Sequence, residues 1–196
     1  MTKQSLGIDY FETLYRANPD PWNFATSDYE HRKYQATLDA LQRPLYANAL
    51  EVGCSIGVLT ARLATRCKTL NAIDLSPSAI AKAMTTCSAV RNIRFSVGGA
   101  PNNLPLGPFD LIVLSEVLYY LDKEDLLSLA TWCCHSTASE ADIVLCHWLG
   151  PTDYPLSGDY ASKLFVKAMQ PCLESHAILH EEVYRLERIR LCAKEL

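Results

Sequence analysis

The stretch Asn48-Ala-Leu-Glu51-Val-Gly53-Cys-Ser55-Ile-Gly57 decides the fold class of this chain. Its first part, residues 48–54, is a short apolar run of the kind found in buried parallel strands. The small residues that follow let the backbone approach a ligand closely, and the free amides at the start of the next helix can bind an anion. The stretch therefore predicts a ligand site at the end of a buried strand.

Similar apolar runs lie at 69–75, 93–97, 109–117 and 142–149, and two more strand candidates lie near 176–193. Helical patterns separate most of these runs. Ser76-Pro77 and Asp122 provide helix starts, and a further helix is expected at about 159–170. Because strands and helices alternate, the sequence predicts an α/β fold around a parallel sheet.

The length of 196 residues, with 49% hydrophobic and 20% charged content, predicts a single domain over 1–196. Residues 1–47 hold two helical patterns around a turn-rich segment, and we expect them to form a helical cap over the site. The Rossmann-like core is expected over 48–196. The polar loop 150–158, GPTDYPLSG, is interpreted as a lid.

Composition excludes several classes of protein. A formal charge of −4 without a basic run argues against nucleic-acid binding. The sequence contains no stretch of eighteen apolar residues, so we expect no membrane span. The first residues, MTKQSLGIDYF, lack the features of a secretory signal, so we expect a cytoplasmic protein. The eight cysteines contain no CxxC pair and are interpreted as reduced, mostly buried thiols.

Asp74 ends the second apolar run, twenty-one residues after Gly53. An acid at this place can accept hydrogen bonds from both ribose hydroxyls of a bound nucleoside. Together with the glycine turn, Asp74 predicts an adenosine-type ligand.

These segments resemble the class I S-adenosylmethionine methyltransferases, whose first motif runs acid-x-Gly-x-Gly-x-Gly. Ser55 replaces the middle glycine, and residues 97–103 lack the Asp usual in the family's third motif. Residues 109–121 look like the family's post-adenine strand. The resemblance implies a mostly parallel seven-stranded sheet with helices on both faces, S-adenosylmethionine as cofactor and S-adenosylhomocysteine as product. The cofactor-binding residues that we predict are Trp22, Arg32, Glu51, Gly53, Ser55, Gly57, Asp74, Leu75, Gly99, Ala100 and Ser115.

Asp20-Pro21-Trp22 and then Ser27-x-Tyr29-Glu30-x-Arg32-Lys33-Tyr34 resemble the N-terminal segment of the NodS methyltransferases, as do residues 115–121 (SEVLYYL) and 146–150 (CHWLG). This resemblance, and not composition, implies the acceptor. NodS proteins methylate the free amine at the non-reducing end of a de-N-acetylated chitooligosaccharide during Nod factor synthesis. The predicted partner is thus a small oligosaccharide.

Aromatic residues are expected around this acceptor, because rings can stack on sugar faces. The predicted substrate-binding residues are Tyr120, Trp148, Tyr154 and Tyr160. Core filling and lid packing are the alternative for each of them.

Methyl transfer to an amine depends on orientation, exclusion of water and removal of one proton. Glu116 and His147, each near a strand end, are the candidates to accept that proton, and Tyr119 and Tyr120 complete the predicted catalytic set. His147 titrates in the useful range. A buried histidine without a catalytic task, and Glu116 bound to the cofactor's ammonium, are the alternatives. Arg32 is expected to hold the cofactor's carboxylate, with a surface arginine as its alternative.

Other readings of the same residues stay open. Residues 53–57 also fit G-x-S-x-G, which would make Ser55 the nucleophile of an α/β-hydrolase with His147 or His176 as base. A nicotinamide dehydrogenase is a second alternative, but the chain lacks the G-x-G-x-x-G motif usual in that class. A non-catalytic cofactor-binding module is a third. His176 and His180 are four residues apart but have no third ligand nearby, and transfer from a sulfonium needs no metal, so we predict none.

Overall fold

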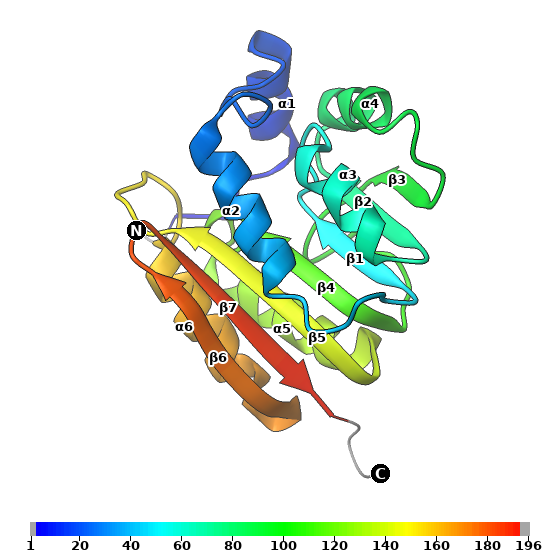
Figure 1. The fold of residues 1–196 in the computed structure, drawn as a ribbon. Helices are drawn as coiled ribbons and strands as arrows, with labels where there is room; N and C mark the ends of the chain where they lie inside the picture. The colour runs from blue at the N-terminus through cyan, green and yellow to red at the C-terminus, as the bar shows by residue number, and fades with distance from the viewer. Residues whose placement is uncertain (1–2, 193–196) are drawn as a thin grey trace.

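A seven-stranded sheet forms the centre of the computed structural model, which describes residues 3–192 (Figure 1). The strands are β1 (Ala49–Val52), β2 (Leu70–Asp74), β3 (Ile93–Val97), β4 (Phe109–Ser115), β5 (Thr137–Trp148), β6 (Leu173–Glu181) and β7 (Tyr184–Leu191). Their order is β3-β2-β1-β4-β5-β7-β6, with β1 to β5 parallel and β7 antiparallel to both neighbours. The chain reverses direction across the sheet between β1 and β4, and ligands bind at such a switch point in open α/β sheets.

Helices cover both faces of this sheet (Figure 1). They are α1 (Ile8–Ala17), α2 (Asp28–Asp39), α3 (Val58–Leu63), α4 (Pro77–Thr86), α5 (Lys123–Ser136) and α6 (Gly158–Met169). Because successive strand side chains point to opposite faces, Ile112 and Leu114 of β4 pack toward α5 and α6, whereas Leu111 and Val113 pack toward α2 and α3. The predicted fold, a mostly parallel sheet between helices, is confirmed.

Two helices start where the sequence predicted. The Ser76 hydroxyl accepts a hydrogen bond from the Ala79 amide, with Pro77 in the first turn of α4. The Asp122 carboxylate accepts one from the Asp125 amide at the start of α5. Both strand-to-helix turns are therefore fixed by local side chains.

The N-terminal segment lies against the carboxyl ends of the central strands. Phe11 and Tyr15 of α1 pack with Ile56 of the glycine turn, and Tyr34 and Leu38 of α2 pack beside β4 and β5. Among residues 3–192, no helix is long and apolar enough to cross a membrane.

The interpretation of all cysteines as reduced thiols is wrong for one pair. Cys134 and Cys172 form a disulfide in the structure, with their Cα atoms 6.2 Å apart. They are 38 residues apart in the sequence and meet only because the end of α5 packs beside the turn that follows α6. The other cysteines of the described chain are free, and all except Cys192 are buried.

Candidate functional site

The turn after β1 has a backbone that its small residues make possible. Gly53, Ser55 and Gly57 all have positive φ angles, of 76°, 49° and 83°. A Cβ on Gly53 would lie 2.7 Å from the Val117 side chain, and one on Gly57 would lie 3.0 Å from the Ala83 Cα. Gly57 therefore allows α3 and α4 to pack closely, whereas Gly53 keeps the strand end open.

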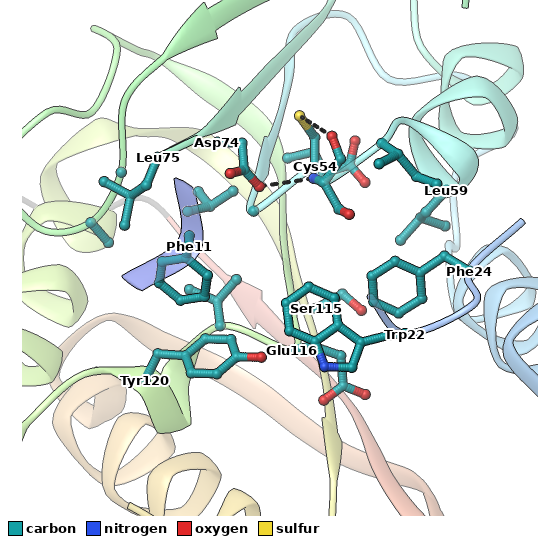
Figure 2. A pocket seen from close by; sticks show the side chains of 18 of the residues that line it. Phe11, Trp22, Phe24, Cys54, Leu59, Asp74, Leu75, Ser115, Glu116 and Tyr120 are labelled. Carbon is teal, nitrogen blue, oxygen red and sulfur yellow. Dashed lines mark hydrogen bonds between the residues drawn. The ribbon is translucent and has the colours of Figure 1, made fainter. Parts of the chain in front are cut away.

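A cleft of about 890 Å³, open to solvent, lies at this turn and at the ends of β2 and β4 (Figure 2). It is lined by nine of the eleven residues predicted to bind the cofactor: Trp22, Glu51, Gly53, Ser55, Asp74, Leu75, Gly99, Ala100 and Ser115. Gly57 and Arg32 are not among its lining residues. We call this cavity the donor cleft.

Asp74 faces the donor cleft with both carboxylate oxygens held by backbone amides. One oxygen accepts from the Ser55 amide and the other from the Ser76 amide, each at 2.9 Å. Burial raises the pKa of Asp74 to about 6, although the two amides oppose this effect. Each oxygen keeps a lone pair, so the carboxylate can still accept hydrogen bonds from a ribose.

Glu51 lies deeper, at the end of β1. It is 2% exposed, and its Oε2 has no hydrogen-bond partner in the described part of the chain. Burial raises the pKa of Glu51 to about 8, although the nearby Thr60 hydroxyl, which also lacks a hydrogen-bond partner among the described residues, opposes this effect. An orphaned carboxylate oxygen in a cleft is satisfied by a donor such as an ammonium, which S-adenosylmethionine carries on its methionine moiety. The residues present thus fit this cofactor.

Aromatic residues of the N-terminal segment complete the donor cleft and were not predicted from the sequence. They are Phe11, Tyr15, Phe24 and Tyr34, and Figure 2 shows Phe24 beside Trp22 and Phe11 beside Tyr120. The spacing of Phe11 and Tyr15 places both on one face of α1, which is the signal that could have revealed them.

The structure argues against Arg32 as the cofactor's carboxylate ligand. Arg32 is exposed on α2, while the next residue, Lys33, has a side chain that is 3% exposed. A step of one residue turns a helix by about 100°, so Arg32 and Lys33 point in different directions, and Lys33 is the one paired with Glu116. No lysine or arginine is among the described residues that line the donor cleft.

A second cavity of about 660 Å³ adjoins the first, and we call it the acceptor cavity. Its lining residues are Trp22, Phe24, Tyr29, Glu30, Lys33, Glu116, Tyr119, Tyr120, Trp148, Thr152 and Tyr154. Four of them, Trp22, Phe24, Glu116 and Tyr120, also line the donor cleft. The two cavities therefore share a wall.

Glu116 sits in that wall with a positive φ of 57°. Its Oε1 accepts from the Lys33 ammonium at 2.7 Å, and its Oε2 accepts from the Tyr119 hydroxyl and from the Trp148 amide at 3.0 Å. Burial alone would raise the pKa of Glu116, but the charge of Lys33, His147 and the hydrogen bonds from Lys33 and Tyr119 together lower it. Glu116 is thus a buried anion whose hydrogen-bond capacity is largely used.

The structure also argues against His147 as a general base. It is fully buried and lines neither cavity. Its Nε2 accepts the Leu118 amide at 3.1 Å, and its Nδ1 lies 3.4 Å from the Ser162 hydroxyl. Burial lowers the pKa of His147 to about 4, so the ring is neutral and fixes the turn after β4.

Three of the four aromatic residues predicted to bind the substrate line the acceptor cavity, and one does not. Tyr120, Trp148 and Tyr154 line the acceptor cavity, and Tyr120 and Tyr154 meet edge to face with ring centres 4.6 Å apart. Tyr160 does not line it. Tyr160 is 42% exposed on the solvent side of α6, where its ring lies beside Lys123.

The hydrolase alternative lacks its base. The Ser55 hydroxyl accepts a hydrogen bond from the Tyr15 hydroxyl. Neither His147 nor His176 lines the donor cleft, and His176 lies in β6 against Glu187. Ser55 therefore has no histidine to activate it.

The comparisons with known proteins agree with this geometry. The family model of nodulation protein S (NodS) matches residues 12–140. Nodulation protein S of Sinorhizobium fredii is 35% identical over 127 residues, which cover 63% of this chain and 58% of that relative. The chain thus spans little more than half of this relative's length.

Two solved structures are similar as well. A protein from Pseudomonas syringae, described as a candidate methyltransferase, is 32% identical with a TM-score of 0.70, covering 83% of this chain and 98% of its own. The N-methyltransferase NodS from Bradyrhizobium japonicum, in complex with S-adenosylhomocysteine, has a TM-score of 0.77 at 23% identity and covers 92% of this chain and 97% of its own. Since the NodS model matches well over half of its residues, this chain belongs to the nodulation protein S family.

Proposed function

We propose that this protein is an S-adenosylmethionine-dependent N-methyltransferase. Its acceptor is the free amine of the non-reducing-end glucosamine of a de-N-acetylated chitooligosaccharide. One observation carries the proposal: the donor cleft and the acceptor cavity share the wall of Trp22, Phe24, Glu116 and Tyr120. A methyl donor in one and an amine in the other would meet at that wall.

The cofactor supplies an electrophilic methyl group on a sulfonium. Asp74 would bind the ribose hydroxyls, and the orphaned Oε2 of Glu51 would accept from the ammonium of the methionine moiety. Trp22 and Phe24, whose rings stack at 5.5 Å, would cover the ligand and exclude water. The complex of the Bradyrhizobium relative with S-adenosylhomocysteine supports this choice of cofactor.

The acceptor cavity has the properties that a sugar amine needs. Trp148, Tyr154 and Tyr120 offer ring faces for apolar stacking on the sugar. Glu116 would attract a cationic amine to the shared wall, with Tyr119 holding the carboxylate in place. Correct orientation of an amine in line with the methyl group accounts for much of the expected acceleration.

The proposal is tested by incubating the protein with methyl-labelled S-adenosylmethionine and two chitooligosaccharides. The oligomer with a de-N-acetylated terminal sugar should become labelled. The fully acetylated oligomer should not, because the lone pair of an amide nitrogen is delocalised into the carbonyl. Equal labelling of both, or labelling of neither while another small amine is methylated rapidly, would refute the substrate assignment.

A methyltransferase that acts on another small amine is the second candidate. Structural similarity to a phosphoethanolamine N-methyltransferase from Haemonchus contortus, with a TM-score of 0.78 at 15% identity, shows that this fold also serves such a protein. A panel of small amines in the same assay separates the two. The absence of a nucleic-acid partner and the cytoplasmic location remain predictions.

A further inference from the structure

The structure assigns to Glu30 a role for which it is better placed than Glu116 or His147, because one of its oxygens accepts no hydrogen bond. We propose that Glu30 binds the acceptor's ammonium and takes up the proton that the amine loses before attack, with Lys33 as its positioning residue. This inference rests on the proposed N-methyltransferase function and names the residue that prepares the amine.

The two carboxylates that line the acceptor cavity differ in how many hydrogen bonds they accept. Both oxygens of Glu116 already accept hydrogen bonds, from Lys33 on one side and from Tyr119 and Trp148 on the other. Glu30 differs, because only its Oε1 is bonded, to the Lys33 ammonium at 2.8 Å. No donor among the described residues meets hydrogen-bond geometry with its buried Oε2, although the Tyr34 hydroxyl lies near enough to lower the pKa of this carboxylate.

A second unpartnered atom lies in the same cavity. The Tyr29 hydroxyl is buried and has no hydrogen-bond partner in the part of the chain that the structure describes. Buried polar atoms without partners are rare in folded proteins. Both residues line the acceptor cavity, where an ammonium can donate to a carboxylate oxygen and to a phenol oxygen.

The position of Glu30 is fixed by its surroundings. Its amide donates to the Ser27 hydroxyl at the start of α2, and its side chain is held by Lys33 one turn later. Burial alone would lower the pKa of Lys33, but the carboxylates of Glu116 and Glu30 raise it. Lys33 therefore stays charged and joins the two carboxylates across the cavity.

The charge of the cavity favours a cation. Its charged lining residues are two carboxylates, Glu30 and Glu116, and one ammonium, Lys33, which leaves a net charge of −1. Burial raises the pKa of Glu30, against the opposing effects of Lys33 and the Tyr34 hydroxyl and with the added repulsion of Glu116. A carboxylate with a raised pKa accepts a proton more readily than Glu116, whose pKa is lowered.

These groups account for the proton and for every bond that forms or breaks in the reaction. The ammonium R–NH3⁺ gives one proton to Oε2 of Glu30 and becomes R–NH2. The nitrogen lone pair forms the new C–N bond while the C–S bond breaks, and its electrons stay on sulfur. The product leaves as R–NH2⁺–CH3, and Glu30 releases its proton to water.

Glu30→Gln tests the proposal, since it keeps the shape of the side chain and removes the charge. We expect kcat/KM for the amine acceptor to fall about 100-fold, the usual scale for loss of a general base. Glu30→Asp should recover part of the activity. Asp39→Asn is the matched control, because Asp39 is exposed on the same helix and loses the same charge. It should leave activity unchanged.

Two further measurements separate catalysis from structure. The affinity of Glu30→Gln for S-adenosylhomocysteine, measured by calorimetry, and its melting temperature should match the wild type. On the acid side, the wild-type kcat/KM should follow both Glu30 and the amine, whereas the variant should follow the amine alone. Wild-type kcat/KM and pH profile in the variant, or joint loss of cofactor affinity and melting temperature, would overturn the role of Glu30.

The proposed substrate can fail separately. If the wild type methylates another amine but no chitooligosaccharide, the substrate assignment fails, and the Glu30 variants are compared on that amine. If the wild type methylates no amine, both the function and the role of Glu30 are refuted.

Discussion

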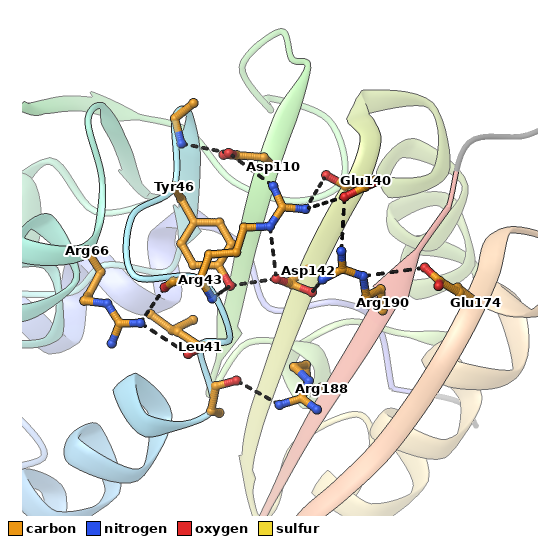
Figure 3. A network of polar contacts seen from close by, with 12 residues as sticks. Leu41, Arg43, Tyr46, Arg66, Asp110, Glu140, Asp142, Glu174, Arg188 and Arg190 are labelled. Atoms are coloured by element: carbon orange, nitrogen blue, oxygen red, sulfur yellow. Dashed lines mark hydrogen bonds and ion pairs between the residues drawn. The ribbon is translucent and has the colours of Figure 1, made fainter.

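The two ends of the same sheet differ in how completely their buried polar side chains are hydrogen-bonded. At the amino-terminal end, Asp142 is fully buried, accepts from the Tyr46 hydroxyl at 2.6 Å and lies 3.4 Å from an Arg190 nitrogen (Figure 3). Asp110 accepts from the amides of Ala47 and Asn48 nearby. None of the buried side-chain atoms without a partner in residues 3–192 belongs to this network.

At the carboxyl-terminal end, Asp74 and Glu116 have both oxygens hydrogen-bonded, but other buried groups are incomplete. Tyr29, Glu30 and Glu51 each leave one buried polar atom without a hydrogen bond among the described residues, and all three line a cavity, whereas the other such atoms, on Thr60 and Glu187, line neither cavity. Leaving such an atom unsatisfied costs stability, which a ligand can restore. The amino-terminal end, where buried groups are paired, therefore stabilises the fold, and we call it the paired end. The carboxyl-terminal end, where some are unpaired, is suited to ligand binding, and we call it the unpaired end.

The largest expected effect is on the paired end. Asp142→Ala removes the carboxylate that accepts from Tyr46 and Arg190 and pairs with Arg43, and we expect the free energy of unfolding to fall by about 3 kcal/mol or more. Urea denaturation measures this loss. Glu140→Ala is the control, because Glu140 contacts the same arginines from a side chain that is 68% exposed and should cost less than about 1 kcal/mol. Equal losses would contradict the distinction.

Glu51→Gln tests the unpaired end through pH. The pKa of Glu51 is raised to about 8 in the folded protein, so its contribution to stability is present below the unfolded pKa near 4.5 and is lost as pH rises through 8. At pH 9 the ligand-free variant should therefore be more stable than the wild type, by on the order of 3 kcal/mol. At pH 4 the two should nearly coincide.

Denaturant unfolding of both proteins at the two pH values measures this difference. Asp74 shows the same direction of shift and is present in both proteins, and its repulsion of Glu51 is part of the expected difference. Glu124→Gln, at an exposed position of α5, should not alter the pH dependence. The Glu51 variant should also bind S-adenosylhomocysteine more weakly. A variant with unchanged pH dependence would show that Glu51 is not a strained buried acid.

Asp74 and Asp110 each accept hydrogen bonds from two backbone amides, so Asp74→Ala and Asp110→Ala form a matched pair. We expect Asp74→Ala to weaken S-adenosylmethionine binding by about 1.5 to 3 kcal/mol, the scale of a charged hydrogen bond, as measured by calorimetry. Asp110→Ala at the other end of the sheet should lower stability but leave the affinity of the folded protein unchanged. Unchanged affinity in a folded Asp74 variant would remove it from the site.

The smallest effect is expected for Ser55→Ala. The variant loses the hydrogen bond from the Tyr15 hydroxyl, worth about 1 kcal/mol, and should keep most methyl transfer. A hydrolase would need Ser55 as its nucleophile. Esterase activity of the wild type that disappears in this variant would reverse the reading of the turn.

The sequence by itself determined the fold and the floor of the donor cleft. Strand and helix patterns repeat over short distances, and a residue such as Asp74 at a strand end must lie at the edge of a parallel sheet. Gly53 and Ser55 follow from the same local logic, because the turn directly after β1 needs small residues.

Only the tertiary structure decided which side chains complete the two cavities. The run of charges in α2 did not distinguish Arg32 from Lys33, since the choice depends on Glu116, 83 residues after Lys33. His147 ends a strand as expected, but the turn after β4 and α6 surround it and use both of its nitrogens. Burial and pairing of polar groups arise from segments distant in the sequence, and local pattern carries no record of them.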